Sequence, residues 1–138
     1  MPHRTAPTLQ SLDTPVRSIM RAGVIAVPDD ASIRQVQRAL VAHRIHAVLV
    51  VGARSGEVVG WATAGGVLGR MDPDGSLLPA TLAVAEPAEV ISPTATVEEA
   101  RRRLVDTGAA RLLVCRADGW QPEGVISELD LIRVATPS

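Results

Sequence analysis

The sequence predicts a mixed α/β (α+β) fold built from two copies of a β-α-β-β-α unit. Residues 60–66 read Gly-Trp-Ala-Thr-Ala-Gly-Gly, and residues 124–130, 64 positions later, read Gly-Val-Ile-Ser-Glu-Leu-Asp. A glycine, an apolar pair and a hydroxyl residue thus recur in the same order, and the two halves stay in this register from about residue 27 to residue 68. Self-similarity at a long, fixed period indicates one supersecondary unit that is stacked on its copy.

Short apolar segments bounded by proline or turn residues predict three strands in each half. The predicted strands are 24–27, 47–51 and 58–62 in the first half and 90–91, 111–115 and 124–126 in the second. A proline follows the first strand of each half and ends it, because proline has no backbone N–H to donate to a sheet. The turns at 52–56 and 117–119 then join the last two strands of each half into a hairpin.

A helix between the first and second strands is predicted in each half by a matching start signal. Ser32 with Gln35, and Thr96 with Glu99, have the spacing of capping boxes, in which two side chains satisfy otherwise unpaired backbone donors. Apolar residues follow at the spacing of one helical stripe. The predicted stripe is Ile33, Val36, Leu40 and Val41 in the first half and Val97, Ala100, Leu104 and Val105 in the second.

A second, shorter helix follows each hairpin, at residues 64–71 and 128–135. The first of these contains three glycines, and each costs about 1 kcal/mol relative to alanine in a helix interior. We therefore expect packing rather than helix propensity to hold it. The predicted organisation is an N-terminal extension (1–14), a first repeat (15–71), a linker (72–81) and a second repeat (82–138).

The composition is that of a globular protein and argues against several classes of function. The 138 residues are 46% hydrophobic and 21% charged, which suffices for a buried core. No apolar run approaches the roughly 18 to 20 residues that span a bilayer, and the N-terminus lacks the apolar stretch of a secretory signal. We therefore expect a cytoplasmic protein without membrane contact. A net charge of −1 and two tryptophans as the whole aromatic content argue against nucleic-acid binding.

Several residues that look like functional signals have simpler interpretations. Cys115 is the single cysteine and ends an apolar run, so we expect a buried structural thiol. His43 and His46 have no nearby Cys, Asp or Glu to complete a ligand set, so no metal is expected. The three arginines at 101–103 follow two glutamates and are expected on a solvated helix face. Trp120, in the second hairpin turn, is interpreted either as a partner contact or as a cover for the hairpin base.

The repeated units resemble a known family. Two β-α-β-β-α units, each closing with a glycine, two apolar residues and a hydroxyl residue, are similar to tandem cystathionine-β-synthase (CBS) domains, the pair called a Bateman module. The resemblance covers about residues 15–135; the second motif is a full match and the first is partial, because it lacks the final Asp. It implies two repeats packed through their sheets with pseudo-twofold symmetry, clefts for adenosine-containing ligands, pairing into dimers, and regulation of an enzyme, channel or transporter.

The second motif also has a chemical rationale as a nucleotide site. Gly124 lets the backbone approach a ligand closely, and Ser127 lies at a helix start where hydroxyl and N–H groups suit a phosphate. Asp130 is about one helical turn later on the same face, where a carboxylate can accept two hydrogen bonds from a ribose diol. The alternative is that Ser127 is a plain N-cap and Asp130 an acid stabilised by the helix dipole.

The resemblance implies further ligand contacts in the second repeat. Arg111 precedes the strand 112–114, where related modules often carry a basic residue that reaches a phosphate, and a guanidinium suits that task. An arginine that merely covers the strand entrance fits the sequence equally well. The other candidates are walls and backbone edges around an adenine, and they fit core positions as well: Val90, Ile91, Ala109 and Ala110.

The first repeat departs from the pattern. Thr63 keeps the hydroxyl, but Gly66 stands where the ribose-binding acid is expected. Ala47 stands at the position of Arg111, although Arg44 and His46 are nearby in sequence. A hydrogen bond to a charged group contributes roughly 1.5 to 3 kcal/mol. We therefore expect this degenerate second site to be empty, weak or used for a different ligand.

The sequence thus predicts a regulatory sensor with one site for an adenosine-containing ligand of the AMP, ADP, ATP or S-adenosylmethionine class. No cofactor is required, and the ligand state passes to an unidentified regulated protein; a homodimer is expected. The alternative is a ligand-independent dimerisation or interaction module, which the missing acid of the first repeat supports. No enzyme is predicted, because no nucleophile–base pair or metal cluster occurs, and Glu128 and Asp130 should point to different helix faces.

Overall fold

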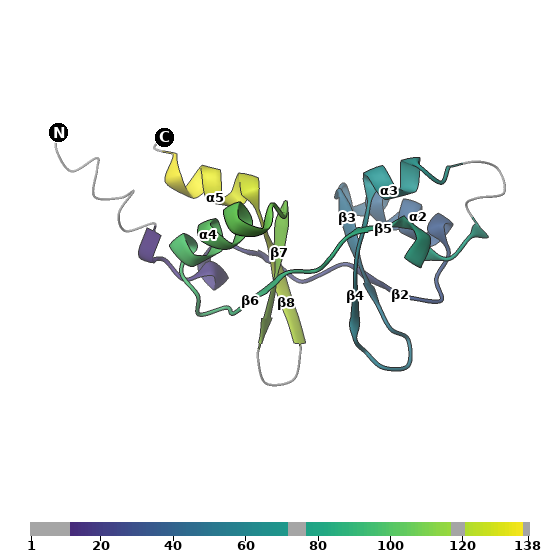
Figure 1. The fold of residues 1–138 in the computed structure, drawn as a ribbon, viewed down its shortest axis with the longest axis horizontal. Coiled ribbons are helices and arrows are strands. Elements are labelled where there is room, and N and C mark those ends of the chain that lie inside the picture. The colour runs from purple at the N-terminus through teal and green to yellow at the C-terminus, as the bar shows by residue number, and fades with distance from the viewer. Residues whose placement is uncertain (1–11, 72–76, 117–120, 137–138) are drawn as a thin grey trace. The chain divides into compact units, whose positions relative to one another are not determined.

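The computed structural model describes residues 12–71, 77–116 and 121–136, and it divides into two compact units (Figure 1). The first-repeat unit is the continuous segment Val24–Ala88. The second-repeat unit combines the described residues up to Gly23 with those from Glu89 onward. Trp120, the turn at 117–119 and part of the expected linker (72–76) lie outside the described residues.

The first-repeat unit is a four-stranded sheet with helices packed against it (Figure 1). Its strands, in spatial order, are β2 (Ala26–Pro28), β3 (Ala47–Val51), β4 (Val58–Thr63) and β5 (Val84–Glu86). β2 and β3 are parallel because helix α2 (Ile33–His43) connects them, whereas β3–β4 and β4–β5 are antiparallel. Helix α3 (Ala64–Leu68) follows β4, and a short 3-10 helix (Ala80–Ala83) leads into β5.

The second-repeat unit has the same plan. Its strands, in spatial order, are β1 (Arg21–Ala22), β8 (Gln121–Ser127), β7 (Arg111–Arg116) and β6 (Val90–Ile91). β6 and β7 are parallel around helix α4 (Val97–Thr107), and β8 is antiparallel to both β7 and β1. Helix α5 (Glu128–Ala135) follows β8, and a short 3-10 helix (Val16–Ser18) precedes β1. The predicted mixed fold of two equivalent units is confirmed.

Each sheet ends in an edge strand from outside its own β-α-β-β-α segment. β1 pairs with β8, although the sequence predicts residues 15–22 as part of the first repeat. β5 pairs with β4, although the sequence predicts its residues as part of the second. The 3-10 helices before these strands place Val16 and Ala80, which are 64 positions apart, in the cores of the two units with no exposed surface. The repeat therefore extends upstream of the register seen in the sequence.

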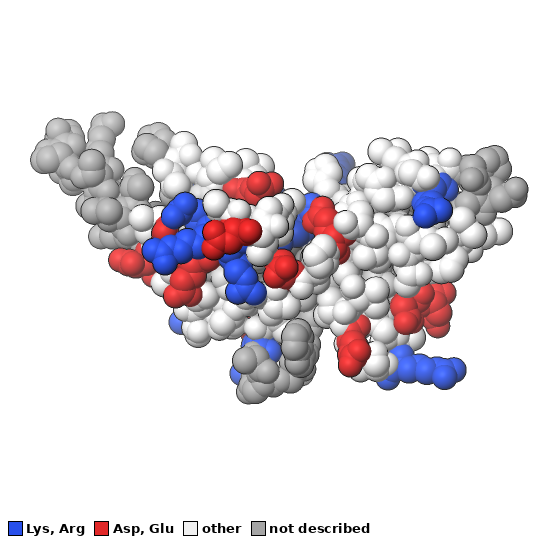
Figure 2. Space-filling model, viewed as in Figure 1, with Lys and Arg blue, Asp and Glu red and all other residues white. Residues whose placement is uncertain are grey.

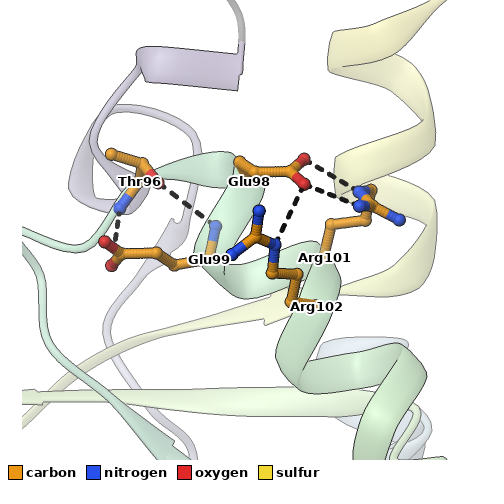
Figure 3. A network of polar contacts seen from close by, with 5 residues as sticks. All are labelled: Thr96, Glu98, Glu99, Arg101 and Arg102. Carbon is orange, nitrogen blue, oxygen red and sulfur yellow. Dashed lines mark hydrogen bonds and ion pairs between the residues drawn. The ribbon is translucent and has the colours of Figure 1, made fainter.

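The predicted capping boxes start α2 and α4. The Ser32 Oγ accepts from the Gln35 N–H at 3.3 Å, and the Ser32 N–H donates to Gln35 Oε1 at 2.9 Å. The corresponding distances for Thr96 and Glu99 are 3.1 and 3.3 Å (Figure 3). These reciprocal bonds satisfy donors that an isolated helix start leaves unpaired, and both helices begin where the sequence predicts.

The apolar stripe predicted for these helices is correct except at its last position. Ile33 and Val36 are fully buried, but 78% of Val41 is exposed, and 68% of its counterpart Val105 is exposed. Successive residues turn by about 100° around a helix, so Val41 lies to one side of the face that Leu40 shares with the core. Likewise α3 ends at Leu68 instead of Met71, the end expected from the sequence, within a glycine-rich segment of low helix propensity.

The arginine run on α4 forms the solvated face that the sequence predicts, and two of its arginines pair with Glu98. Arg101 Nη2 lies 2.6 Å and Arg102 Nε lies 3.3 Å from Glu98 Oε1 (Figure 3). The Arg101 hydrogen bond and the charges of both guanidinium groups lower the pKa of Glu98 to about 2, against desolvation that raises it. On the face shown in Figure 2, basic and acidic side chains are interspersed, so no single-sign patch forms there.

Two further findings concern expectations from composition. Cys115 is buried in β7 with 3% of its surface exposed, as predicted, and burial and the nearby Glu123 raise the pKa of its thiol. Within the described ranges, no helix is both long and apolar enough to cross a membrane.

Candidate functional site

The candidate site is the junction where β8 ends and α5 begins. Ser127 is both the last residue of β8 and the N-cap of α5. Its Oγ accepts from the Asp130 N–H at 3.3 Å, while its own N–H and hydroxyl donate to Asp130 Oδ2 at 2.9 and 3.0 Å. The two residues thus form a third capping box. Ser127 is the N-cap and Asp130 is an acid in the first helical turn, as their structural interpretations hold.

Asp130 is one of the two polar residues that are buried among the described residues, with 8% of its surface exposed. Its Oδ2 is occupied by the two donors from Ser127. Its Oδ1 lies 3.7 Å from Nε of Arg21, which is too long for a hydrogen bond but close enough for an ion pair. Because each carboxylate oxygen can accept about two hydrogen bonds, Oδ1 keeps acceptor capacity that the protein does not fill through Ser127.

Arg111 lies beside this junction. It is the first residue of β7 and the ladder partner of Ser127 across the β7–β8 pair. The preceding residue, Ala110, accepts a hydrogen bond at 3.2 Å from the backbone N–H of Glu128. The half-buried arginine, the hydroxyl and the carboxylate predicted from sequence therefore belong to one local structure, because Arg111 and Asp130 are each paired with Ser127.

Gly124 has a packing reason to be glycine. A Cβ at this position would lie 2.5 Å from the carbonyl oxygen of Arg21 and 2.7 Å from Sδ of Met20. The close approach at Gly124 is thus made by the incoming strand β1, whose residue Ala22 is the ladder partner of Gly124. A ligand contact by this glycine stays a prediction, and strand packing explains its type.

The residues predicted to surround an adenine have other roles in the structure: one side chain lies in the core, and two backbone groups form hydrogen bonds within the protein. The Ile91 side chain belongs to the core of the second-repeat unit, as its alternative interpretation holds. The Val90 carbonyl accepts from Arg103 Nη2 at 3.0 Å, and the Ala109 N–H donates to Thr107 Oγ1 at 3.2 Å. The Ala109 N–H would have to exchange this partner to donate to an adenine, whereas the Val90 carbonyl can accept a second hydrogen bond.

The first repeat has half of the same junction. Thr63 caps α3, and its Oγ1 accepts from the Gly66 N–H at 2.9 Å, but no acid returns a bond. A Cβ at Gly66 would overlap the carbonyl of Ala83, which is a backbone group and cannot swing away. The 3-10 helix that leads into β5 therefore requires glycine at this position, and the glycine leaves the junction without a carboxylate.

The polar residues that the sequence places near Thr63 belong to the end of α2 and the loop after it. Arg44 ends α2 in the left-handed conformation with φ of 53°, and His43 is the last residue of that helix. The backbone carbonyl of His46 accepts from the Ala64 N–H at 2.9 Å, as Ala110 does for Glu128 in the other repeat. Within the ranges that the structure describes, no three His, Cys, Asp or Glu side chains gather as a metal site.

Sequence reasoning missed Arg21, which brings a positive charge to Asp130 from the other half of the chain. The motif relates only residues that are close together in sequence, so it gives no information on a contact with Arg21. The available signal was the repeat itself. Extending the 64-residue register upstream aligns Pro15 with Pro79, and this shows that residues 15–22 correspond to the strand segment 79–86.

Comparison with known proteins agrees with this architecture. The family model for the CBS domain matches the chain twice, over residues 16–72 and 83–136, whereas none of the curated proteins matches it. The CBS domain of a bacterial CNNM/CorC family Mg2+ transporter in complex with ATP superposes with a TM-score of 0.83 at 18% identity, covering 97% of this chain and 95% of that chain. The CBS domain of a membrane protein from Sphaerobacter thermophilus gives 0.79 at 20% identity, with coverages of 99% and 97%.

A third similar structure is CBSX2 in complex with AMP, with a TM-score of 0.70 at 19% identity over 88% of this chain and 96% of that chain. At these identities the likeness concerns the fold. The two family matches, by contrast, cover most of the chain and fall one on each repeat. The chain therefore belongs to the CBS-domain family, and it is a pair of CBS domains, which are regulatory modules.

Proposed function

We propose that this chain is a sensor that binds an adenosine-containing nucleotide at the start of α5 and passes its ligand state to a partner protein. The carrying observation is the pairing of Ser127 with a buried Asp130 whose Oδ1 is not bonded by Ser127. A ribose diol can donate to that oxygen, and Arg111 beside Ser127 supplies a cation for phosphate.

Two similar structures support the ligand class. The CBS domain of the CNNM/CorC family transporter was solved with ATP, and CBSX2 was solved with AMP. We extend this chemistry to the second repeat of this chain because its motif residues lie together at one helix start. The partner would recognise the conformation that the ligand favours. The ligand can shift the protein toward that conformation only by the difference between its affinities for the two conformations. Membrane transporters are one class of partner to test.

The proposal is tested by ligand-induced stabilisation and by titration calorimetry. AMP, ADP, ATP, S-adenosylmethionine, NADH and cyclic dinucleotides are each added to the purified chain at millimolar concentration. A ligand at 100 times its Kd adds about 2.7 kcal/mol to the free energy of unfolding. We expect stabilisation by at least one adenine nucleotide, and no stabilisation by any of them would contradict the proposal.

Asp130→Ala and Glu99→Ala form the matched pair of variants for this experiment. Each removes the carboxylate of a capping box in the same unit, but Glu99 lies at the start of α4 and is exposed. Both variants are expected to lose stability from the lost cap. Only Asp130→Ala should also lose nucleotide binding, and equal binding by both variants would remove Asp130 from the site.

The first repeat is proposed to contribute no ribose site of this kind. Gly66 carries no acceptor, and the Ala83 carbonyl occupies the space that a side chain there would need. Calorimetry should therefore give one nucleotide per chain. Two equivalent sites per chain would show that the first repeat binds by another arrangement.

A second candidate function is a dimerisation or interaction module that needs no ligand. It is supported by apolar side chains left exposed on α4 and α5, including Val105, Leu129 and Ile132. Sedimentation at several concentrations, with and without AMP, separates the two proposals. A homodimer that forms equally in both conditions, in a chain that no nucleotide stabilises, would favour the interaction module.

Two further expectations remain proposals. We infer that the chain is not an enzyme, because CBS domains are regulatory modules that are generally non-catalytic. We also infer a cytoplasmic location without direct contact to nucleic acid or membrane.

A further inference from the structure

We propose that Arg21 is a gate on the nucleotide site, which holds Asp130 in the empty state and must be displaced by the ribose. This inference rests on the function proposed above and adds a residue that sets the affinity of the same site. Arg21 is in β1, and its Nε lies 3.7 Å from Asp130 Oδ1. No motif in the second repeat contains it.

The position of the Arg21 guanidinium at the one open oxygen of Asp130 sets up the competition. Oδ2 already accepts two hydrogen bonds, from the backbone N–H and the hydroxyl of Ser127. A vicinal diol brings two further donors, and Oδ1 has room for about two. The guanidinium of Arg21 stands at this same oxygen, so the diol and the arginine address one acceptor.

The geometry allows the arginine to leave without unfolding anything. The Arg21 backbone is fixed by its ladder pairing with Val125, whereas 60% of its side chain is exposed to solvent. At 3.7 Å the contact is an ion pair without a short hydrogen bond. Release therefore requires only a change of side-chain rotamer, and its cost is electrostatic. Such a cost falls as added salt screens the pair.

Adenosine is the decisive probe because it has the ribose diol but carries no charge. We expect Arg21→Gln to bind adenosine more tightly than the unmodified chain, by up to about fivefold, because an exposed ion pair contributes up to about 1 kcal/mol. The adenosine affinity of the unmodified chain should rise between 20 and 500 mM NaCl, because salt screens the ion pair that competes with the ribose. The affinity of Arg21→Gln should not change.

Arg17→Gln is the matched control. Arg17 is an exposed arginine on the 3-10 helix of the same N-terminal segment, and its replacement changes the net charge equally. It should bind adenosine like the unmodified chain and keep the salt dependence. Thermal unfolding without ligand shows whether Arg21→Gln remains folded. If it does not, Arg21→Lys, which keeps the charge on a compact head group, should show a partial gain.

The contact itself is observed without any ligand. The NMR signal of the Arg21 Nε–Hε group, identified by its loss in Arg21→Gln, should shift in Asp130→Asn and shift in the same direction when AMP is added. AMP binding with equal or weaker adenosine binding by Arg21→Gln would overturn the gate and leave the proposed function standing. Failure of every variant to bind AMP or adenosine would overturn the proposed function, and the gate with it.

Discussion

Gly66 and Asp130 occupy equivalent positions three residues after a capping hydroxyl, and their surroundings differ. At Asp130 the carboxylate accepts two hydrogen bonds from Ser127 and forms an ion pair with Arg21. At Gly66 the carbonyl of Ala83 lies where a Cβ would be. An acid could therefore not be introduced into the first repeat by a single substitution, because the backbone of its own edge segment fills the space.

Gly66→Ala and Gly65→Ala test this interpretation within one helix. A Cβ at Gly66 would overlap backbone, whereas a Cβ at Gly65 would meet only Thr63 Oγ1, at an ordinary 3.8 Å. We expect Gly66→Ala to lower the free energy of unfolding by about 2 kcal/mol or more from overpacking. Gly65→Ala should raise it, by up to about 1 kcal/mol from helix propensity. Denaturant unfolding measures both, and equal effects would show that α3 tolerates either side chain.

Glu98 provides a prediction for low pH. Its pKa is lowered to about 2 from an ordinary value of 4.5, first by the hydrogen bond from Arg101. A lowered folded-state pKa means that its contribution to stability is present above pH 4.5 and is lost as the pH falls toward 2. NMR titration of the Glu98 carboxylate should show this, and Arg101→Ala should return the pKa toward its ordinary value. An unchanged pKa in that variant would contradict the assignment.

The predictability of the site follows from how far apart its residues are in sequence. Ser127 and Asp130 are three positions apart at a helix start, so their meeting follows from helix geometry alone. Arg111 reaches them through one hairpin, which the sequence also indicates. Arg21 arrives through an edge strand of two residues, and no local pattern predicts that pairing.

Among the elements, the two edge strands are the least predictable and carry particular weight. β1 and β5 are too short to show the alternation of apolar residues by which longer strands are recognised. By contrast, α2 and α4 begin at the residues expected, because a capping box is a signal contained within four neighbouring residues. The stripe prediction failed at Val41 because the heptad-like spacing overestimates how wide the buried face is.

The width of the buried face on α2 is measurable. Val36 is fully buried, whereas 78% of Val41 is exposed on the same helix. Val36→Ala should reduce the free energy of unfolding by about 2 kcal/mol, from two lost methyl groups and the cavity they leave. Val41→Ala should change it by less than about 0.5 kcal/mol. If both cost the same in monomeric protein, Val41 would belong to the core after all.

Each edge segment packs in one unit, so a substitution in that segment should weaken the helix and strand of the unit that it contacts. Val16 packs in the core with α4, and Ala80 packs in the core with α2. Val16→Thr and Ala80→Ser each put a hydroxyl into a core, at a cost of about 1 to 3 kcal/mol if it finds no partner. Hydrogen exchange should then rise in α4 and β7 for Val16→Thr, and in α2 and β3 for Ala80→Ser. Faster hydrogen exchange in α2 and β3 for Val16→Thr, and in α4 and β7 for Ala80→Ser, would contradict these packing assignments.

In the whole molecule, the duplication specifies two similar units, and the path of the chain makes them unequal. The first-repeat unit is one continuous stretch, Val24–Ala88, whereas the second-repeat unit is assembled from two stretches that flank it. The mixed α/β class, the duplicated plan and the helix starts are predictable because each follows from local signals repeated at one period. The division of the chain between the units is not, because it depends on pairing between distant segments.

This division has a consequence for the order in which a newly made chain folds. The segment that ends in β1 leaves the ribosome before residues 24–88, yet its partner β8 is synthesised after them. The continuous unit can complete its sheet in the meantime, while the early segment waits. The entropic cost of closing so long a loop grows only logarithmically with its length, so the delay is one of timing more than of final stability. Pulse-labelling of nascent chains should find residues 24–88 protected before any protection appears in β1.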